Sequence, residues 1–226
     1  MTDLHHPDPI ARTLARDAAN GSETSRTMLG AWFVVGALLV IALIDGVLLE
    51  LRSEGYGLGL VREYGAVESF QTMLLAVCFV LFWMAWRASN GAARTASFAL
   101  MLLAAAMFVR ELDVKKFDGP DWYNWIAQRG LQEILLVGMT VPILIYLVRH
   151  WREWIDLIWM GLRPAALPLY VAGALILTGA YFDARIHGWS EKVFWEEFIE
   201  LNGYLFFALA AYLHLQIVRG AVRGTS

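Results

Sequence analysis

Cysteine and charged residues are scarce in this chain. Cysteine occurs once in the 226 residues, as Cys78, and charged residues make up only 17% of the sequence. A single cysteine excludes a disulfide framework and a cysteine-based zinc or iron–sulfur site within one chain. The net charge of -3 provides no basic excess that would attract a nucleic-acid backbone. The composition therefore excludes a disulfide scaffold and a nucleic-acid-binding protein.

The short motifs of several enzyme classes are also missing. The chain has no HExxH or HxxxH histidine pair, no G-x-S-x-G nucleophile turn and no phosphate-binding Walker loop. Gly55, Gly57 and Gly59 alternate in SEGYGLGL, but no strand pattern precedes them, so they do not form a dinucleotide fingerprint. The lack of a nucleophile motif argues against covalent catalysis.

Hydrophobic residues dominate what remains, at 58% of the chain with ten tryptophans and a mean hydropathy of +0.52. A helix needs about 20 mostly apolar residues to cross a bilayer. Six stretches are candidates, running approximately over Leu29–Leu49, Phe70–Trp86, Ala96–Val109, Ile134–Val148, Leu167–Phe182 and Phe198–Val218, and the third and fourth are extended at their outer ends by more polar residues. The sequence therefore predicts an all-α polytopic membrane protein with six transmembrane helices in one domain, residues 29–226.

Residues 1–28 are polar and contain no apolar signal-peptide core, so they predict a mobile tail with a short helix over Pro9–Ala19. Six spans place both termini on one side. Ten arginines lie on that side, against eight basic residues on the other, and the short turn between the second and third spans is purely basic. The positive-inside rule then predicts an inner-membrane protein with cytoplasmic termini.

A tryptophan-rich segment, residues 149–163, precedes the fifth span. Its large apolar residues recur at i, i+3, i+4, i+7, i+8 and i+11 (Trp151, Trp154, Ile155, Ile158, Trp159 and Leu162). This spacing predicts one apolar helical face, and tryptophans concentrate at the headgroup level of bilayers. We expect an amphipathic helix on the inner membrane surface.

Three glutamates suggest an internal repeat. Glu68, Glu133 and Glu200 each open a helix that runs inward, and nineteen positions later each is followed by an arginine (Arg87, Arg152 and Arg219). The separations of 65 and 67 residues are compatible with three helical hairpins, although polar helix ends can also align by chance.

Fifteen of the 21 acidic residues fall on the predicted outer side. The candidate ligand- or ion-binding carboxylates are Asp45, Glu68, Glu111, Glu133, Asp183, Glu197 and Glu200, with Glu68, Glu133 and Glu200 as candidate catalytic groups. A charge at membrane depth costs about 2.5–3.5 kcal/mol, so these side chains need partners. Arg110 and Arg185 are the expected electrostatic partners, and pairing with them would be a purely structural role.

The alternative is an outward-facing, water-filled pocket that binds a divalent cation or relays protons. His187 with Asp183, Glu197 and Glu200 is the candidate metal set, in which the many oxygens favour Mg, Ca or Mn. His214, inside the sixth span, is expected to bond to a neighbouring helix rather than to a metal.

Three functions remain open: binding or transport of a cation- or proton-coupled small solute or lipid, metal-dependent hydrolysis or group transfer on a lipid or lipid-linked substrate, and a structural accessory role. The expected partners are the lipid bilayer, a lipid or solute ligand, and further copies of the chain or a membrane complex.

Overall fold

A computed structural model describes residues 9–56, 65–111, 131–185 and 191–223. These residues form helices and no strands, in accord with the predicted all-α class. The helices are α1 (Pro9–Ser53), α3 (Ala66–Ala88), α4 (Gly91–Glu111), α6 (Leu131–Arg149), α7 (Trp154–Gly161), α8 (Leu167–Arg185) and α9 (Lys192–Arg223), with short 3-10 turns η2 (Trp151–Glu153) and η3 (Pro164–Ala166). The chain divides into two compact units, and the boundary along the sequence falls between Gly46 and Val47.

The first unit contains most of α1. This helix begins at the predicted Pro9, a residue that is favourable at a first helical position, but it continues to Ser53 instead of ending at Ala19. Asn20 and Gly21 are weak helix formers, but the helix continues through them and through Ser22–Ser25 into the apolar segment. The segment Ala31–Ser53 has a mean hydropathy of 2.6 and is long enough to cross a membrane.

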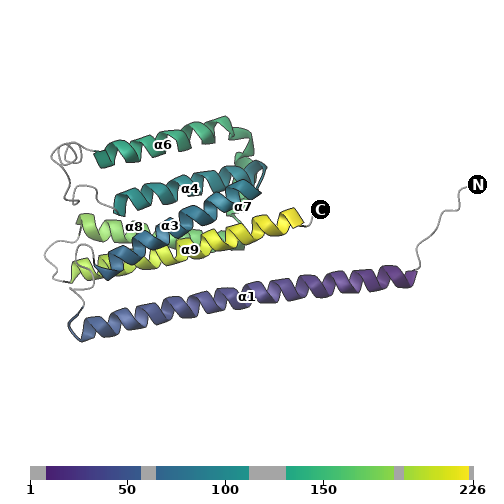
Figure 1. Ribbon diagram of the computed structural model, residues 1–226, viewed down its shortest axis with the longest axis horizontal. Coiled ribbons are helices and arrows are strands. Elements are labelled where there is room, and N and C mark those ends of the chain that lie inside the picture. The colour runs from purple at the N-terminus through teal and green to yellow at the C-terminus, as the bar shows by residue number, and fades with distance from the viewer. Residues whose placement is uncertain (1–8, 57–64, 112–130, 186–190, 224–226) are drawn as a thin grey trace, which may run out of the picture. The chain divides into compact units, whose positions relative to one another are not determined.

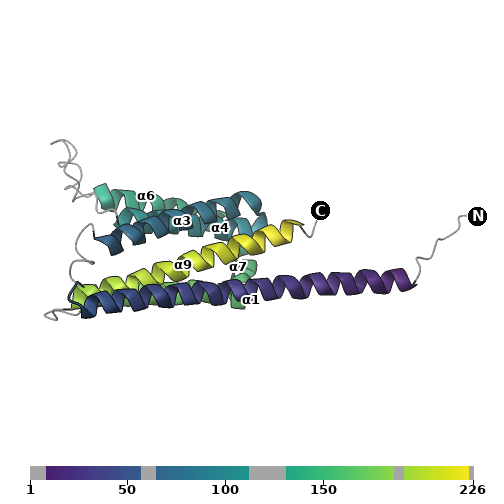
Figure 2. The same cartoon turned by 60° about the horizontal axis from the view of Figure 1, so that its bottom comes forward.

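The second unit is a bundle in which α6 packs on α4, α4 on α3, α3 on α9 and α9 on α8 (Figures 1 and 2). Its core lies between α3, α4, α8 and α9, with Phe82, Tyr204 and Phe207 among the most buried side chains. Helix α9 is the central element, because 56% of its spanning window is buried against 28% or less in the other candidate spans. Lipid-facing positions are consequently concentrated on the other helices.

Five helices are long and apolar enough to cross a membrane: Ala31–Ser53, Ala66–Ala88, Gly91–Glu111, Pro164–Phe182 and Lys192–Gly220. They correspond to five of the six predicted spans. The remaining predicted span forms α6, in which the described apolar part is the shorter segment Thr140–Arg149. Multi-pass membrane character is therefore supported, and the sixth span stays a prediction.

The threefold repeat is not confirmed. Glu68 and Glu133 are each the third residue of their helices, whereas Glu200 is the ninth residue of α9. The arginines differ as well, since Arg152 lies beyond the end of α6, in η2, while Arg219 lies within α9. Equal spacing along the sequence therefore does not give equal depth in the helices.

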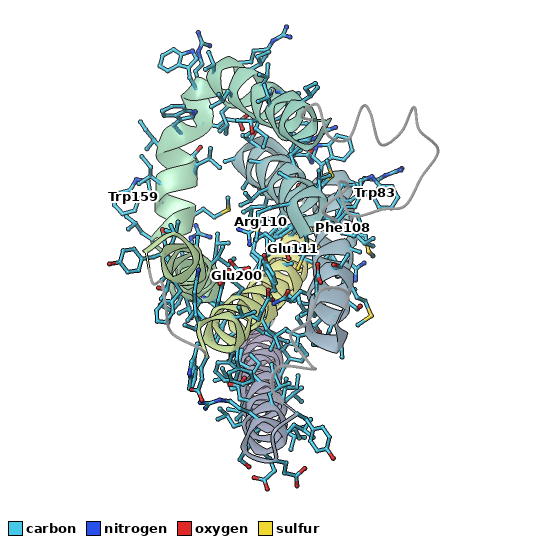
Figure 3. The ribbon with its side chains drawn as sticks, turned by 90° about the vertical axis from the view of Figure 1, so that its left-hand side faces the viewer. Trp83, Phe108, Arg110, Glu111, Trp159 and Glu200 are labelled. Carbon is cyan, nitrogen blue, oxygen red and sulfur yellow. The ribbon has the colours of Figure 1, made fainter. Side chains whose placement is uncertain are left out.

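The tryptophan-rich segment is helical, as predicted, although η2 replaces its first turn. All six residues of the predicted apolar face are exposed, and Figure 3 shows Trp159 pointing away from the bundle. Leu157 and Met160, on the opposite face, line a cavity of the second unit. The exposed apolar face has the character of a membrane-contacting surface.

We predict that this face meets lipid. A spin label on Ile158→Cys, in a Cys78→Ala background, should be relaxed more strongly by oxygen than by a water-soluble paramagnetic complex. Asp156→Cys, which is on a polar side of the same helix, is the matched control and should show the reverse order. Equal behaviour of both labels would remove the surface-helix assignment.

A second prediction concerns the contact of α8 with α9. A Cβ atom at Gly203 would lie 2.6 Å from Ile176 Cγ1 and 3.2 Å from the Ile176 backbone nitrogen. Gly203→Ala should therefore destabilise the bundle by about 2 kcal/mol through overpacking. Gly173→Ala, where a Cβ meets open space on α8, should be neutral or stabilising by up to about 1 kcal/mol. Thermal unfolding in detergent measures both, and an undiminished stability of Gly203→Ala would contradict the close helix approach.

Candidate functional site

A buried polar network joins α4 and α9 near the predicted outer ends of these helices. Arg110 Nη2 donates to Glu200 Oε2 at 2.7 Å and lies 3.0 Å from Glu111 Oε1. Tyr204 Oη donates to Glu111 Oε1 at 2.6 Å and accepts from Arg110 Nη2 at 3.3 Å. Figure 3 shows Arg110, Glu111 and Glu200 gathered between the helices. One guanidinium thus holds two carboxylates, and the tyrosine closes the network.

The local sequence explains why these groups meet. Glu200 and Tyr204 are four residues apart and therefore share one face of α9. Arg110 and Glu111 end α4, where a cation is favoured by the helix dipole. Gly179 on α8 makes room for Glu200, because a Cβ atom at position 179 would overlap the Glu200 side chain. The side chains of Glu200 and Glu111 are only 7% and 10% exposed, so their charges depend on Arg110.

Glu197, one turn before Glu200, has a different environment. Its carboxylate Oε2 accepts a hydrogen bond of 3.0 Å from Gln71 Nε2, and the same nitrogen lies 3.1 Å from the Glu197 backbone oxygen. Gln71 comes from α3 and is fully buried. Its Oε1 is the one buried side-chain oxygen or nitrogen without a hydrogen-bond partner among the described residues. A neutral amide, and not a cation, is therefore the direct partner of Glu197.

The described part of this site is rich in negative charge. It contains three carboxyl groups, Glu111, Glu197 and Glu200, and one guanidinium, Arg110. In an apolar environment an uncompensated carboxylate is expensive, and such a group is expected to bind a proton or to find a cation. The arrangement can therefore hold and release protons at the end of an otherwise apolar bundle.

The structure brings together three of the seven predicted carboxylates, Glu111, Glu197 and Glu200. Glu68 is half-buried in the first turn of α3, one turn before Gln71, and Asp45 belongs to the first unit. The side chains of Glu133, Asp183 and Arg185 and the whole of His187 lie outside the described residues.

The predicted metal set remains untested for the same reason. Within the described ranges, no group of three histidine, cysteine, aspartate or glutamate side chains has the spacing to hold a metal ion. Two of the four predicted ligands, Asp183 and His187, are not part of the described side chains. A divalent cation therefore stays a prediction.

Sequence reasoning missed Gln71 and Tyr204. Gln71 lies near the start of α3, among Glu68, Ser69 and Thr72, so it reads as part of a polar helix end and gave no specific signal. Tyr204 follows Glu200 at helical spacing, but tyrosines are frequent in membrane helices, so its hydroxyl gave no specific signal.

The opposite end of the bundle has a different chemistry. Arg87 and Arg94 lie over the rings of Trp83 and Trp86, with guanidinium carbons 5.6 Å and 5.3 Å from the ring centroids. Thr95 donates to Glu153 at 2.5 Å, which ties α4 to η2. Arginine, tryptophan and the polar groups of η2 thus collect where α3 ends and α4 begins.

The prediction that His214 bonds to a neighbouring helix is confirmed, because its Nε2 lies 2.7 Å from Ser97 Oγ on α4. Phe82 packs beside the ring at a centroid distance of 6.1 Å.

Comparison with protein-family models, curated proteins and solved structures found no match for the chain. The interpretation of the site therefore rests on its geometry and chemistry.

We predict that Arg110 stabilises the network. Arg110→Gln leaves the buried carboxyl groups of Glu111 and Glu200 without their cation, which should cost about 3 kcal/mol, at the low end for a buried pair because Arg110 itself is 40% exposed. The double variant with Glu200→Gln should recover part of this loss. Unfolding in detergent is the measurement.

The matched control is Arg52→Gln. Arg52 forms an ion pair with Glu191, whose side chain is 48% exposed, and lies over the rings of Phe194 and Trp195. Because Arg52→Gln leaves no buried carboxyl group without its cation, the loss should be smaller, about 1–2 kcal/mol. If Arg52→Gln and Arg110→Gln reduce the free energy of unfolding equally, the α4–α9 network stabilises the protein no more than the Arg52–Glu191 pair does.

Proposed function

We propose that the chain is an integral membrane protein that binds a proton at Glu197 and uses this buried carboxyl site in proton-coupled binding or transport of a small solute. The observation that carries the proposal is the partner of Glu197, which is the neutral amide of Gln71 at 3.0 Å. Arg110 is engaged by Glu200 and Glu111, so it does not serve as a direct ion-pair partner of Glu197.

The Gln71 amide suits a site whose proton occupancy changes. Its NH2 group donates to an ionised Glu197, whereas its carbonyl oxygen accepts from a protonated one. Rotation of the amide exchanges the two and gives up the hydrogen bond from Nε2 to the Glu197 backbone oxygen. The buried, unpartnered Oε1 supports this role, because a hydrogen-bond acceptor in that position gains a donor when the amide turns toward a carboxylic acid. Protonation and amide orientation are thereby linked.

We also propose that the protein lies in the cell (inner) membrane with both termini cytoplasmic. The arginine and tryptophan residues at the junction of α3 and α4 support this orientation, because arginine is enriched on the cytoplasmic side and tryptophan at the headgroups. Glu197 and Glu200 then lie toward the outer surface, in reach of external protons.

A structural accessory role is the second candidate. It is favoured by Arg110, which ties the end of α4 to α9 through Glu200 and Tyr204. The two candidates differ at Glu197, because a merely structural network has no use for a carboxyl group that exchanges a proton.

Infrared difference spectra of the purified protein, recorded between acidic and alkaline pH, test the proposal. The wild type should show the carbonyl stretch of a protonated carboxylic acid that disappears at alkaline pH, and Glu197→Gln should lack this band. Because glutamine keeps an oxygen that accepts from Gln71, the stability of Glu197→Gln should be unchanged or higher.

Glu191→Gln is the control, since Glu191 is exposed and paired with Arg52. Its spectrum should retain the carboxylic-acid band. If Glu197→Gln also retains the full band, or loses stability as Arg110→Gln is expected to, the proton-binding function is refuted and the accessory role is favoured.

A further inference from the structure

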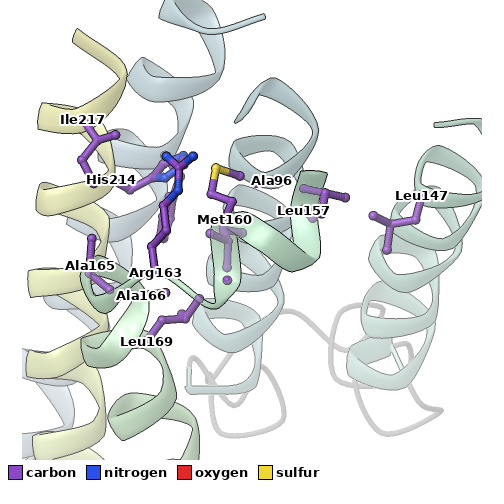
Figure 4. Close-up of a pocket in the computed structure, with 15 residues that line it drawn as sticks. Ala96, Leu147, Leu157, Met160, Arg163, Ala165, Ala166, Leu169, His214 and Ile217 are labelled. Atoms are coloured by element: carbon purple, nitrogen blue, oxygen red, sulfur yellow. The ribbon is translucent and has the colours of Figure 1, made fainter. Parts of the chain in front are cut away.

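A second site lies at the arginine-rich end of the bundle, away from the carboxyl network. Residues of α3, α4, α6, α7, α8 and α9 line a partly open cavity of about 260 Å³, shown in Figure 4. Small side chains leave this space open, in particular Ala96 and Ala99 on α4 and Ala210 on α9. A fully apolar cavity of about 150 Å³ stays dry and takes up apolar ligands, so a larger one with this lining is suited to hydrocarbon.

Two polar side chains interrupt the apolar lining. Arg163, between α7 and η3, is exposed and forms no ion pair with the described residues. His214 comes from α9. In Figure 4 the two side chains extend toward the same part of the cavity. A hydrocarbon chain in the cavity can thus carry one polar end at Arg163 and His214.

The hydrogen bonds of Ser97 define which nitrogen of His214 is available. The single hydroxyl proton of Ser97 is donated to the Ala93 carbonyl oxygen at 2.7 Å. The bond of 2.7 Å between Ser97 Oγ and His214 Nε2 therefore needs its proton from the imidazole, so Nε2 carries hydrogen. The other ring nitrogen, Nδ1, makes no hydrogen bond with the described residues and is not a buried orphan atom, so it is open to the cavity.

We propose that this cavity binds a free fatty acid. The hydrocarbon tail occupies the alanine-lined space, the carboxyl oxygens accept from the Arg163 guanidinium, and the carboxyl proton is shared with His214 Nδ1. A carboxyl group can accept hydrogen bonds from a cation and can also share its proton with a hydrogen-bond acceptor. The cavity volume is slightly below the range of about 300–1,000 Å³ of ligand pockets, which favours one chain over the two chains of a phospholipid.

The position of the cavity supports this ligand. Leu157 and Met160 form its wall on one face of α7, while the other face of the same helix is the exposed apolar surface of Trp154, Ile158 and Trp159. A fatty acid dissolved in the adjacent leaflet therefore has only α7 between it and the cavity. Arg163, at the end of α7, lies where a charged head at the membrane surface is expected.

Binding of tritiated palmitate to the purified protein in nanodiscs of zwitterionic phospholipid tests the proposal. The wild type should bind palmitate saturably, with one molecule per chain. Arg163→Gln should weaken palmitate about tenfold, as for loss of a charge-assisted hydrogen bond, and should leave the weaker binding of methyl palmitate unchanged. Arg219→Gln, an exposed arginine near the end of α9, is the control and should bind palmitate like the wild type.

The cavity itself is tested by Ala99→Trp, which should fill it and abolish saturable binding. Ala174→Trp is the control, because Ala174 is exposed on α8 and does not line the cavity. A series of saturated fatty acids on the wild type needs no variant: affinity should rise with chain length and then level off when the cavity is full.

Three results would overturn the proposal. The first is equal palmitate binding by Ala99→Trp and Ala174→Trp, and the second is displacement of palmitate by anionic phospholipid but not by other fatty acids. The third is an affinity for fatty acids that keeps rising with chain length and does not level off. None of these measurements involves Glu197, so failure here and failure of the proton-binding function are distinguishable.

Discussion

Burial of charge in an apolar bundle is the constraint on which the rest of this structure depends. A polar side chain that is buried away from water needs a partner within the protein. Arg110 meets this need for two carboxylates at once, and Tyr204 completes the set. The small Gly179 on the facing helix is part of the same solution, because a larger residue would displace Glu200. At the α8–α9 contact, the close packing at Gly179 therefore also positions the charged side chain of Glu200.

The same constraint separates Glu197 from its neighbours. Glu200 and Glu111 lie within 3.0 Å of the Arg110 guanidinium, whereas the partner of Glu197 is the Gln71 amide, which contains both a hydrogen-bond donor and an acceptor. A fixed ion pair stabilises one protonation state, while an amide partner accommodates two. In the proposed function, the difference in partner chemistry, and not the number of acidic residues, distinguishes Glu197 from the structural carboxylates Glu111 and Glu200. Counting charges along the sequence does not reveal this distinction.

Much of the architecture could be predicted from hydropathy, because long apolar runs have few alternatives in a membrane. Five spans, the apolar face of the Trp154–Gly161 helix and the helix-to-helix bond of His214 follow from residue spacing alone. The network was only partly predictable: Arg110, Glu111 and Glu200 stand out as charges, but Gln71 and Tyr204 become visible when α3 and α9 are packed together. The threefold repeat is not confirmed, because equal sequence intervals do not take account of where each helix begins.

Helix α9 carries groups of both proposed sites, Glu197 near its beginning and His214 near its end. Seventeen residues separate them, or about 25 Å along a helix, which is well beyond hydrogen-bond reach. Helix α8 contacts both regions as well, since Gly179 adjoins Glu200 and Leu169 lines the cavity. Helices α3 and α4 also reach both regions, α3 through Gln71 and Phe82 and α4 through Arg110 and Ala99. Any influence of proton binding on fatty-acid binding must therefore pass along α9 or through the helices packed on it. Gly203, where Ile176 leaves no space for a Cβ atom, lies between Glu197 and His214 along α9, so a larger side chain there would disturb one of these routes.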